Sequence, residues 1–254
     1  MLPEHLVYLL PTTSVVVFSL VEKLLFDRQA LSSKTQPIFL IVLINLVVSL
    51  GFSAALLIPF VMLVAPLQFV SIAQLDIPGF AMVSLSLLII DLVYYISHRL
   101  HHRLPVLWRL HRLHHSDTHV NAQTTLLHHP LELVSNNLLV ILGAVILDIP
   151  AICLFYYSLI LGLHSAFTHL HLTIPPKVER LMRGFFITPN YHRRHHAKAL
   201  KVSNSNFGMV FIYWDWLCNT ALFHDDKDSM DYGIQTQETP KVINLWHFLI
   251  NPLR

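Results

Sequence analysis

Long apolar stretches dominate the first hundred residues of the chain. Three of them, residues 5–25, 37–65 and 78–97, reach the length of about 20 residues that a helix needs to cross a bilayer. Each is predicted to be a transmembrane helix. A fourth apolar region, residues 134–168, is interrupted at residues 148–150 by AspIlePro, and proline breaks a helix. It predicts a helical hairpin whose first arm is too short to cross a full bilayer.

This pattern predicts an all-α fold: a multi-pass transmembrane bundle of about four membrane helices or helical hairpins, with a histidine-rich helical cap on the cytoplasmic side. No repeat or flexible linker divides residues 1–254, so they are interpreted as a single integral-membrane domain. Residues 1–97 hold the N-terminal membrane helices, and residues 223–254 form a more polar tail. The first residues lack the positive charge of a cleaved signal peptide, so we expect them to stay attached.

Lysine and arginine positions predict the orientation. They are absent from residues 1–22, 35–98 and 113–176, and they gather after the first and third apolar stretches and again from residue 177 onward. Because short loops rich in these residues stay in the cytoplasm, the N-terminus is predicted to lie outside and the histidine clusters at the cytoplasmic face.

Composition supports a membrane protein and excludes several other classes. The chain is 54% hydrophobic and 13% charged, which is too apolar for an ordinary soluble domain of its length. Its formal charge of +2, without any long basic block, argues against a nucleic-acid partner. Two cysteines, Cys153 and Cys218, provide neither a disulfide framework nor a cysteine-based zinc site.

Histidine is unusually frequent, and its spacing indicates metal binding. Fifteen of the 18 histidines lie between His98 and His196. They include one HxxxH pair and two copies of HxxHH, and a spacing of four residues places two imidazoles on one face of a helix. The candidate catalytic and metal-binding residues are His98, His102, His111, His114, His115, His192, His195 and His196. Asp91, seven residues before His98, is predicted to accept a ring N–H from a ligating histidine.

The number of imidazoles predicts two metal ions. A mononuclear zinc site needs only three or four ligands, whereas these clusters offer eight. Imidazole binds zinc, copper, iron and nickel, so the ligand type does not choose the metal. A lipid setting favours a redox metal with oxygen, because zinc performs only acid or hydrolytic chemistry.

Other histidines are weaker candidates. Isolated ones, His5, His119, His224 and His247, are interpreted as interfacial or hydrogen-bonded side chains. His129, in a HisHisPro element followed by Glu132, is open to three interpretations: a ligand, a residue that supports a ligand, or a helix start.

Residues 90–220 resemble the superfamily of fatty acid hydroxylases and sterol desaturases, which are integral-membrane di-iron enzymes with histidine boxes. The resemblance rests on AspLeuValTyrTyrIleSerHisArgLeuHisHis from residue 91, LeuTrpArgLeuHisArgLeuHisHisSer from residue 107, HisProLeuGlu from residue 129 and ThrProAsnTyrHisArgArgHisHis from residue 188. It also includes AsnSerAsnPheGly from residue 204 and the TrpAsp pair at residue 214. The sequence departs from the family at His171 and Asn204, where relatives often carry asparagine and aspartate.

The resemblance implies further ligands and a reaction. It adds His169 and His164 to the metal-binding set. It implies two iron ions as cofactor, O2 as co-substrate, and hydroxylation or desaturation of a membrane lipid. The sequence contains no cytochrome b5 heme motif and no dinucleotide fingerprint, so a separate electron donor of the cytochrome b5, ferredoxin or reductase type is expected.

Two alternative functions stay open at this point. An ether-lipid cleaving monooxygenase shares the same chemistry. A histidine-rich membrane metal transporter does not, but it should carry its histidines near the middle of the membrane rather than beside arginine-rich segments. The sequence does not identify the lipid, the oligomeric state, or whether the membrane is a bacterial inner membrane or the endoplasmic reticulum.

Overall fold

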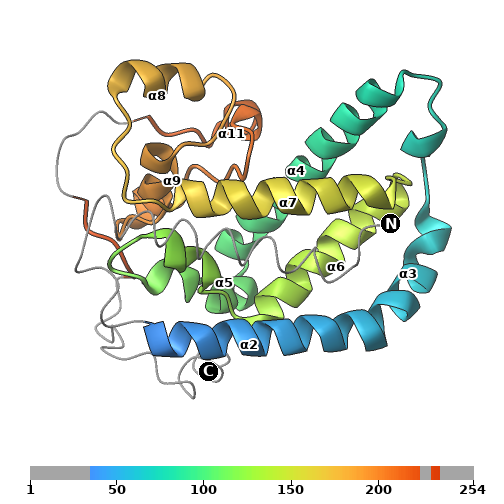
Figure 1. Ribbon diagram of the computed structural model, residues 1–254, viewed down its shortest axis with the longest axis horizontal. Coiled ribbons are helices and arrows are strands. Elements are labelled where there is room, and N and C mark those ends of the chain that lie inside the picture. Colours follow the sequence, from blue (N-terminus) through green and yellow to red (C-terminus); the bar gives the residue numbers. More distant parts are fainter. Residues whose placement is uncertain (1–34, 224–229, 235–254) are drawn as a thin grey trace.

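The computed structural model describes residues 35–223 and 230–234, and this part of the chain contains helices and no β-strand (Figure 1). The all-α prediction is therefore confirmed. The four long helices are α2 (Thr35–Phe52), α4 (Gly79–Arg103), α6 (Pro130–Ile146) and α7 (Ala151–Thr168). The shorter ones are α3 (Ile58–Val64), α5 (Pro105–His111), α8 (Pro176–Met182), α9 (Pro189–His195), α10 (Leu200–Ser203) and α11 (Tyr213–Leu217).

The long helices form a bundle, and the short helices gather at one end of it. In Figure 1, α6 runs obliquely between α2 and α7 and α4 crosses α7 obliquely, while α8, α9 and α11 lie at the upper left and α5 lies below them. α4 packs against α5, α6 and α7, and α2 packs against α6. The histidines at the C-terminal end of α4 therefore lie next to the short helices.

Two helices in the described part of the chain, α4 and α7, are long and apolar enough to cross a membrane. The segments Leu40–Phe52 and Ala55–Leu67 make a third span if the bent pair is counted as one, and α6 is apolar but shorter. The predicted helix at residues 5–25 lies outside the described residues. The count of about four membrane elements and the cytoplasmic orientation of the cap stay predictions.

The predicted helix at residues 37–65 is bent by 42°. A π-helical segment, Ser53–Leu57, separates α2 from α3, and Pro59 stands in the first turn of α3. Proline has no backbone N–H and its ring collides with the carbonyl group one turn earlier, so the backbone widens locally and changes direction. The sequence predicts one helix here because the apolar composition of residues 37–65 is continuous.

The two helices of the hairpin predicted at residues 134–168 are present and are joined by a short turn, but each packs against α4 rather than along the other. α6 ends at Ile146, and α7 begins after Pro150. Asp148 has a φ of 45°, a left-handed conformation that aspartate tolerates better than most residues. Its carboxyl group accepts a hydrogen bond of 2.6 Å from Ser71, which fastens the hairpin turn to the segment before α4.

α4 and α6 approach closely at Gly143. A methyl group at this position would lie 2.9 Å from the side chain of Val93 on α4. The neighbouring core is apolar and includes Ile90, Val140 and Ala144. The lack of a side chain at residue 143 therefore sets how near the two helices lie.

Asp91 fastens the middle of α4 to two other parts of the fold. Its buried carboxyl group accepts hydrogen bonds from Tyr157 of α7, from Trp214 Nε1 at 2.7 Å, and from the backbone N–H groups of Val210 and Phe211 at 3.1 and 3.3 Å. The prediction that Asp91 accepts a ring N–H from a ligating histidine is wrong. The spacing predicts that Asp91 shares a face of α4 with the histidines. The donors to its carboxyl group are instead the backbone N–H groups of residues 210–211 and the indole of Trp214.

Replacing this carboxyl group should destabilise the fold. An Asp91→Asn side chain has one acceptor oxygen instead of two, so at least one buried donor loses its partner, and we expect the free energy of unfolding to fall by about 2 kcal/mol. Thermal unfolding of the purified protein in detergent measures this. The exposed Asp76→Asn variant serves as the control, and equal melting temperatures for the two variants would show that the Asp91 contacts contribute little.

Candidate metal centre

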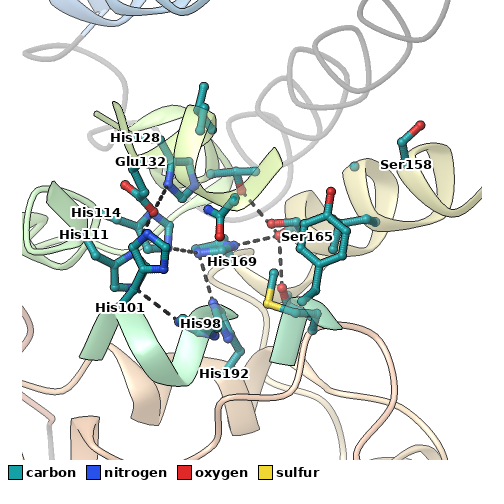
Figure 2. A pocket seen from close by; sticks show the side chains of 18 of the residues that line it. His98, His101, His111, His114, His128, Glu132, Ser158, Ser165, His169 and His192 are labelled. Atoms are coloured by element: carbon teal, nitrogen blue, oxygen red, sulfur yellow. Dashed lines mark hydrogen bonds and ion pairs between the residues drawn. The ribbon is translucent and has the colours of Figure 1, made fainter. Parts of the chain in front are cut away.

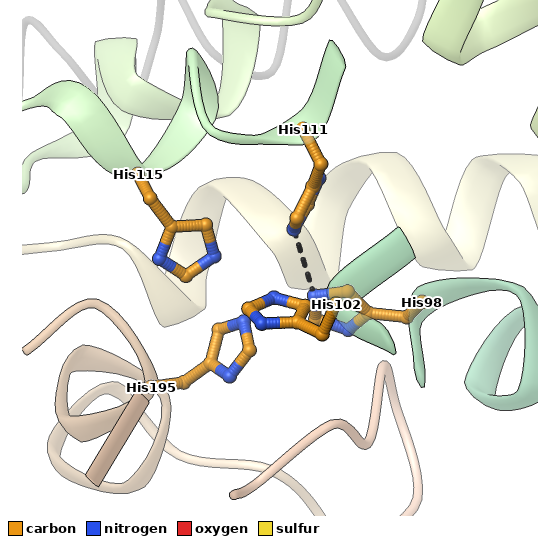
Figure 3. A group of neighbouring side chains, drawn as sticks. All are labelled: His98, His102, His111, His115 and His195. Atoms are coloured by element: carbon orange, nitrogen blue, oxygen red, sulfur yellow. Dashed lines mark hydrogen bonds between the residues drawn. The ribbon is translucent and has the colours of Figure 1, made fainter. Parts of the chain in front are cut away.

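Nine histidines from separate parts of the chain meet in two adjacent groups. The first histidine group contains His98, His102, His111, His115 and His195, and the second contains His114, His169, His192 and His196. Within each group, one ring nitrogen from every member lies within 4.8 Å of all the others. Figure 3 shows the first group, in which rings from α4, from the segment 111–115 and from α9 point toward a common centre.

The ring nitrogens of the second group are packed tightly. His169 Nε2 lies 3.1 Å from Nε2 of His192 and 3.2 Å from Nε2 of both His114 and His196. All four side chains are buried. This arrangement places four possible donor atoms around one point.

Hydrogen bonds at the opposite ring nitrogen determine which Nε2 atoms carry a lone pair. His169 Nδ1 contacts the carbonyl oxygen of Ser165 at 2.7 Å, and His114 Nδ1 contacts that of Thr124 at 3.1 Å. Because a carbonyl only accepts, both rings must carry their proton on Nδ1, and a neutral ring then has an unprotonated Nε2. These two lone pairs face each other at 3.2 Å and repel unless a cation lies between them.

The first group repeats this arrangement. His98 Nδ1 donates to the carbonyl oxygen of Phe207 at 2.9 Å, and His111 Nδ1 donates to Glu132 at 2.7 Å. The Nε2 atoms of the two rings are 3.2 Å apart. Nε2 of His102, His115 and His195 is buried without a hydrogen-bond partner. The residues therefore fit a metal ion in each group, because nitrogen ligands about 2.0–2.1 Å from a tetrahedral ion lie about 3.3 Å from one another.

The two groups are in direct contact. The ring of His115 in the first group stacks on that of His196 in the second, with centroids 4.5 Å apart and planes at 18°. His111 and His114 also lie side by side, with centroids 5.4 Å apart. The two adjacent histidines of each HxxHH motif thus belong to different groups: His115 and His195 to the first, His114 and His196 to the second. The sequence predicts this division for two neighbouring ions.

Burial keeps six of these rings uncharged. It lowers the pKa of His195 to about 3 and that of His169 to about 4. Burial, followed by the neighbouring imidazoles, also lowers the pKa well below the ordinary value at His114, His115, His192 and His196. A neutral imidazole is the form that binds a metal ion, so the site is prepared for binding at neutral pH.

The loop at residues 205–215 positions two histidine rings that are far apart in the sequence. Its backbone carbonyl oxygens at Ser205 and Phe207 accept from His195 and His98. The carboxyl group of Asp215 holds the loop by accepting from the N–H groups of Phe207 and Gly208, both at 2.8 Å. A Cβ atom on Gly208 would lie 2.8 Å from that carboxyl group, so residue 208 must be glycine for the loop to close around Asp215.

The structure brings together nine of the ten predicted metal-binding residues. The exception is His164, which lies outside both groups with its ring near Phe167 and Phe186. His129 is a helix start: its Nδ1 accepts from the N–H of Leu131 and caps α6. Asn204, at one of the positions that depart from the family pattern, has its side chain near His102.

Sequence reasoning missed the environment of Glu132. This buried carboxylate contacts His111 Nδ1 at 2.7 Å and His128 Nδ1 at 2.8 Å. With His111 and His128 it forms a third set of possible ligands. The HisHisProxGlu spacing could have suggested the contact with His128, which lies four residues before Glu132, but nothing in the sequence indicated the contact with His111.

A cavity of about 260 Å³ opens beside both groups. Figure 2 shows His98, His111, His114, His169 and His192 at its inner end, and Ser158 farther along α7. Its other lining residues come mainly from α4, α6 and α7 and include Tyr94, Leu133, Asn137, Leu161 and Met209. A molecule in this cavity would contact rings of both histidine groups and the apolar faces of the long helices.

Comparison with known proteins finds related sequences over the same region. The sequence profile of the family described as fatty acid hydroxylase matches residues 83–220. The chain is 31% identical to alkylglycerol monooxygenase of Caenorhabditis elegans over 152 residues, which cover 58% of this chain and 28% of the relative. It is 30% identical to an ornithine lipid hydroxylase of Rhizobium tropici over 154 residues, or 60% of this chain and 45% of the relative.

A cholesterol 25-hydroxylase-like protein of Danio rerio is 30% identical over 140 residues, or 54% of each chain. The chain thus spans about half, or less, of the length of these relatives. No solved structure matches significantly.

The lowered pKa values predict that the metal-free protein is sensitive to acid. Each affected ring has a folded pKa below the unfolded value of about 6.5, so the unfolded chain binds more protons in acid. We expect the free energy of unfolding to fall as the pH drops from about 6.5 toward about 4, by up to about 1.4 kcal/mol per pH unit and ring.

Denaturant unfolding of chelator-treated protein at several pH values tests this expectation. A His169→Asn variant should show a shallower pH dependence than the wild type, because one neutral buried ring has been removed. Identical slopes for the two proteins would contradict the pKa assigned to His169.

Proposed function

The chain belongs to the fatty acid hydroxylase family, whose profile matches more than half of it, and from this membership we propose that it is an O2-dependent di-iron oxygenase that hydroxylates a membrane lipid. One iron ion would bind to each histidine group. The overall reaction consumes a C–H bond of the lipid, O2, two electrons and two protons, and it yields the alcohol and water.

The observation that carries this proposal is the pair of facing Nε2 contacts, His98 with His111 and His114 with His169, each at 3.2 Å. These contacts occur in two adjacent groups and call for a cation in each. Imidazole alone does not select iron. Family membership and the chemistry of an unactivated C–H bond favour it, because two bound iron ions would pass the carrier's electrons to O2 and supply the oxidising power that the reaction requires.

The chain's own residues would position the lipid and exclude water. The cavity between α4, α6 and α7 would hold a segment of the lipid with its reacting carbon beside both histidine groups. Because the histidine side chains are buried, bulk water has little access to the reacting carbon. The Nδ1–H bonds to backbone carbonyls keep the rings oriented and their Nε2 atoms unprotonated.

The membrane is the source of the substrate in this proposal. α4 and α7 meet the length and hydropathy expected of membrane helices, and both line the cavity, so a lipid can enter it from the bilayer. The histidine groups would face the cytoplasm, where a separate carrier of the cytochrome b5, ferredoxin or reductase type delivers electrons. The related proteins act, by their names, on alkylglycerols, ornithine lipids and cholesterol, which share no single headgroup.

Ether-lipid cleavage is the second candidate, favoured by the similarity to alkylglycerol monooxygenase. Hydroxylation of the carbon beside an ether oxygen gives a hemiacetal, which breaks into an aldehyde and an alcohol. The first step is the same as in lipid hydroxylation. Only the position of the reacting carbon in the lipid differs.

Metal analysis of the purified protein tests the dimetal assignment. We expect about two iron ions per chain, and about one after His98→Ala or His114→Ala, because each substitution removes a donor from a different group. His164→Ala is the matched control, since this histidine lies outside both groups, and it should retain about two. A wild-type stoichiometry of one, or zinc in place of iron, would contradict the assignment.

Comparative lipid mass spectrometry tests the reaction. Cells that express the active chain should accumulate lipids with one added oxygen atom, and the His114→Ala variant should abolish this change because His114 is a donor of the second group. Loss of ether lipids with release of fatty aldehyde would identify ether cleavage instead. Loss of two hydrogen atoms would identify desaturation. Metal transport into vesicles by the purified protein, without O2 consumption, would overturn the enzyme assignment.

A further inference from the structure

We propose that Glu132 is a positioning residue that orients one histidine in each metal-binding group through a single carboxylate oxygen. This inference rests on the proposed dimetal site and adds a residue that is itself in neither group. Glu132 is 1% exposed, and its Oε1 atom lies 2.7 Å from His111 Nδ1 and 2.8 Å from His128 Nδ1. Figure 2 shows the two rings on either side of this carboxylate.

The contact with His111 determines where that ring holds its proton. A carboxylate only accepts, so the proton of His111 is on Nδ1 and the lone pair of Nε2 points toward Nε2 of His98. In the other four rings with an assigned proton, His98, His114, His169 and His195, a neutral backbone carbonyl performs this function. His111 is therefore oriented by a charged partner, which makes its Nε2 a stronger donor to a metal ion.

The contact with His128 extends to the second group. His128 lies flat on His114, with ring centroids 4.4 Å apart and planes at 14°. The imidazole of His128 is fixed by the same Oε1 atom that fixes His111. Glu132 thus supports His111 directly and His114 through a stacked ring, so its loss should loosen both groups.

The local fold holds Glu132 rigidly. It stands in the first turn of α6, which begins with the His129 cap and Pro130, and its N–H donates to the carbonyl oxygen of His129 at 2.9 Å. Its own carbonyl oxygen accepts from Ser135, whose hydroxyl group also contacts His101 Nε2 at 3.0 Å. His101 is a residue of α4, and its Nδ1 atom forms a hydrogen bond with the carbonyl oxygen of Ser97 one turn earlier. The start of α6 is thereby fastened to the helix that carries His98 and His102.

The second carboxylate oxygen also indicates a role beyond structure. Oε2 of Glu132 is buried and has no hydrogen-bond partner, and Glu132 lines the cavity beside the histidine groups. A purely structural carboxylate would be expected to use both oxygens, as Asp215 does with Phe207 and Gly208. Glu132 concentrates its contacts on the two rings.

Metal titration of the full chain in detergent, with Fe(II) as the probe under anaerobic conditions, tests this proposal. We expect Glu132→Gln to weaken Fe(II) binding by about 10-fold to 100-fold, the usual effect of removing a partner of a ligating histidine. The reduction potential of the bound metal should rise, because a negative charge next to a ligand has been lost. The matched control is Glu179→Gln, a buried carboxylate that bonds to Thr188 and Asn190 and to neither ring.

A rescue experiment separates positioning from folding. Glu132→Ala leaves room for a small carboxylate, so added formate should restore much of the Fe(II) affinity, while the isosteric but neutral formamide should not. Wild-type Fe(II) affinity and reduction potential in Glu132→Gln, or an equal loss of affinity in Glu179→Gln, would overturn the proposal. Equal Fe(II) affinities of Glu132→Ala in formate and in formamide would overturn it as well. A wild-type chain that binds no iron would instead refute the proposed function, and this inference with it.

Discussion

Repulsion between imidazole lone pairs is the constraint on which the rest of this structure depends. Each Nδ1 atom that donates to a carbonyl or carboxylate group commits its ring to an unprotonated Nε2, and the fold then presses such atoms to within 3.2 Å of each other. In the absence of a cation this arrangement costs free energy, and burial prevents His114 and His169 from relieving it by taking up protons. The two histidine groups are consequently stable only as parts of a rigid frame.

That frame is made of polar contacts at a few buried positions. Asp91 joins α4 to α7 and to the backbone of residues 210–211, and Asp215 closes the loop whose carbonyl oxygens orient His98 and His195. Both carboxyl groups act on the backbone or on neutral side chains and touch no ring of the centre. The apolar packing between the long helices cannot supply such orientation, because dispersion contacts are not directional.

Much of this architecture could be predicted from the sequence because it is local. Apolar length predicts α4 and α7, AspIlePro predicts the turn at residues 148–150, and the HxxHH spacing predicts which rings share a helix face. Long-range partners could not be predicted: Asp91 faces Trp214, more than a hundred residues later, although its spacing from His98 suggested a histidine. The contact of Glu132 with His111 and the separation of His164 from the centre likewise depend on how helices pack, which no spacing rule encodes.

The close approach of α4 and α6 at Gly143 has a consequence for protein engineering. The two helices flank the cavity, and their separation depends on a position that does not line it. An alanine or serine at residue 143 would act as a wedge that pushes Val93 away and enlarges the cavity from a distance. The width of the cavity is therefore adjustable, at the expense of helix packing, without altering any side chain that lines it.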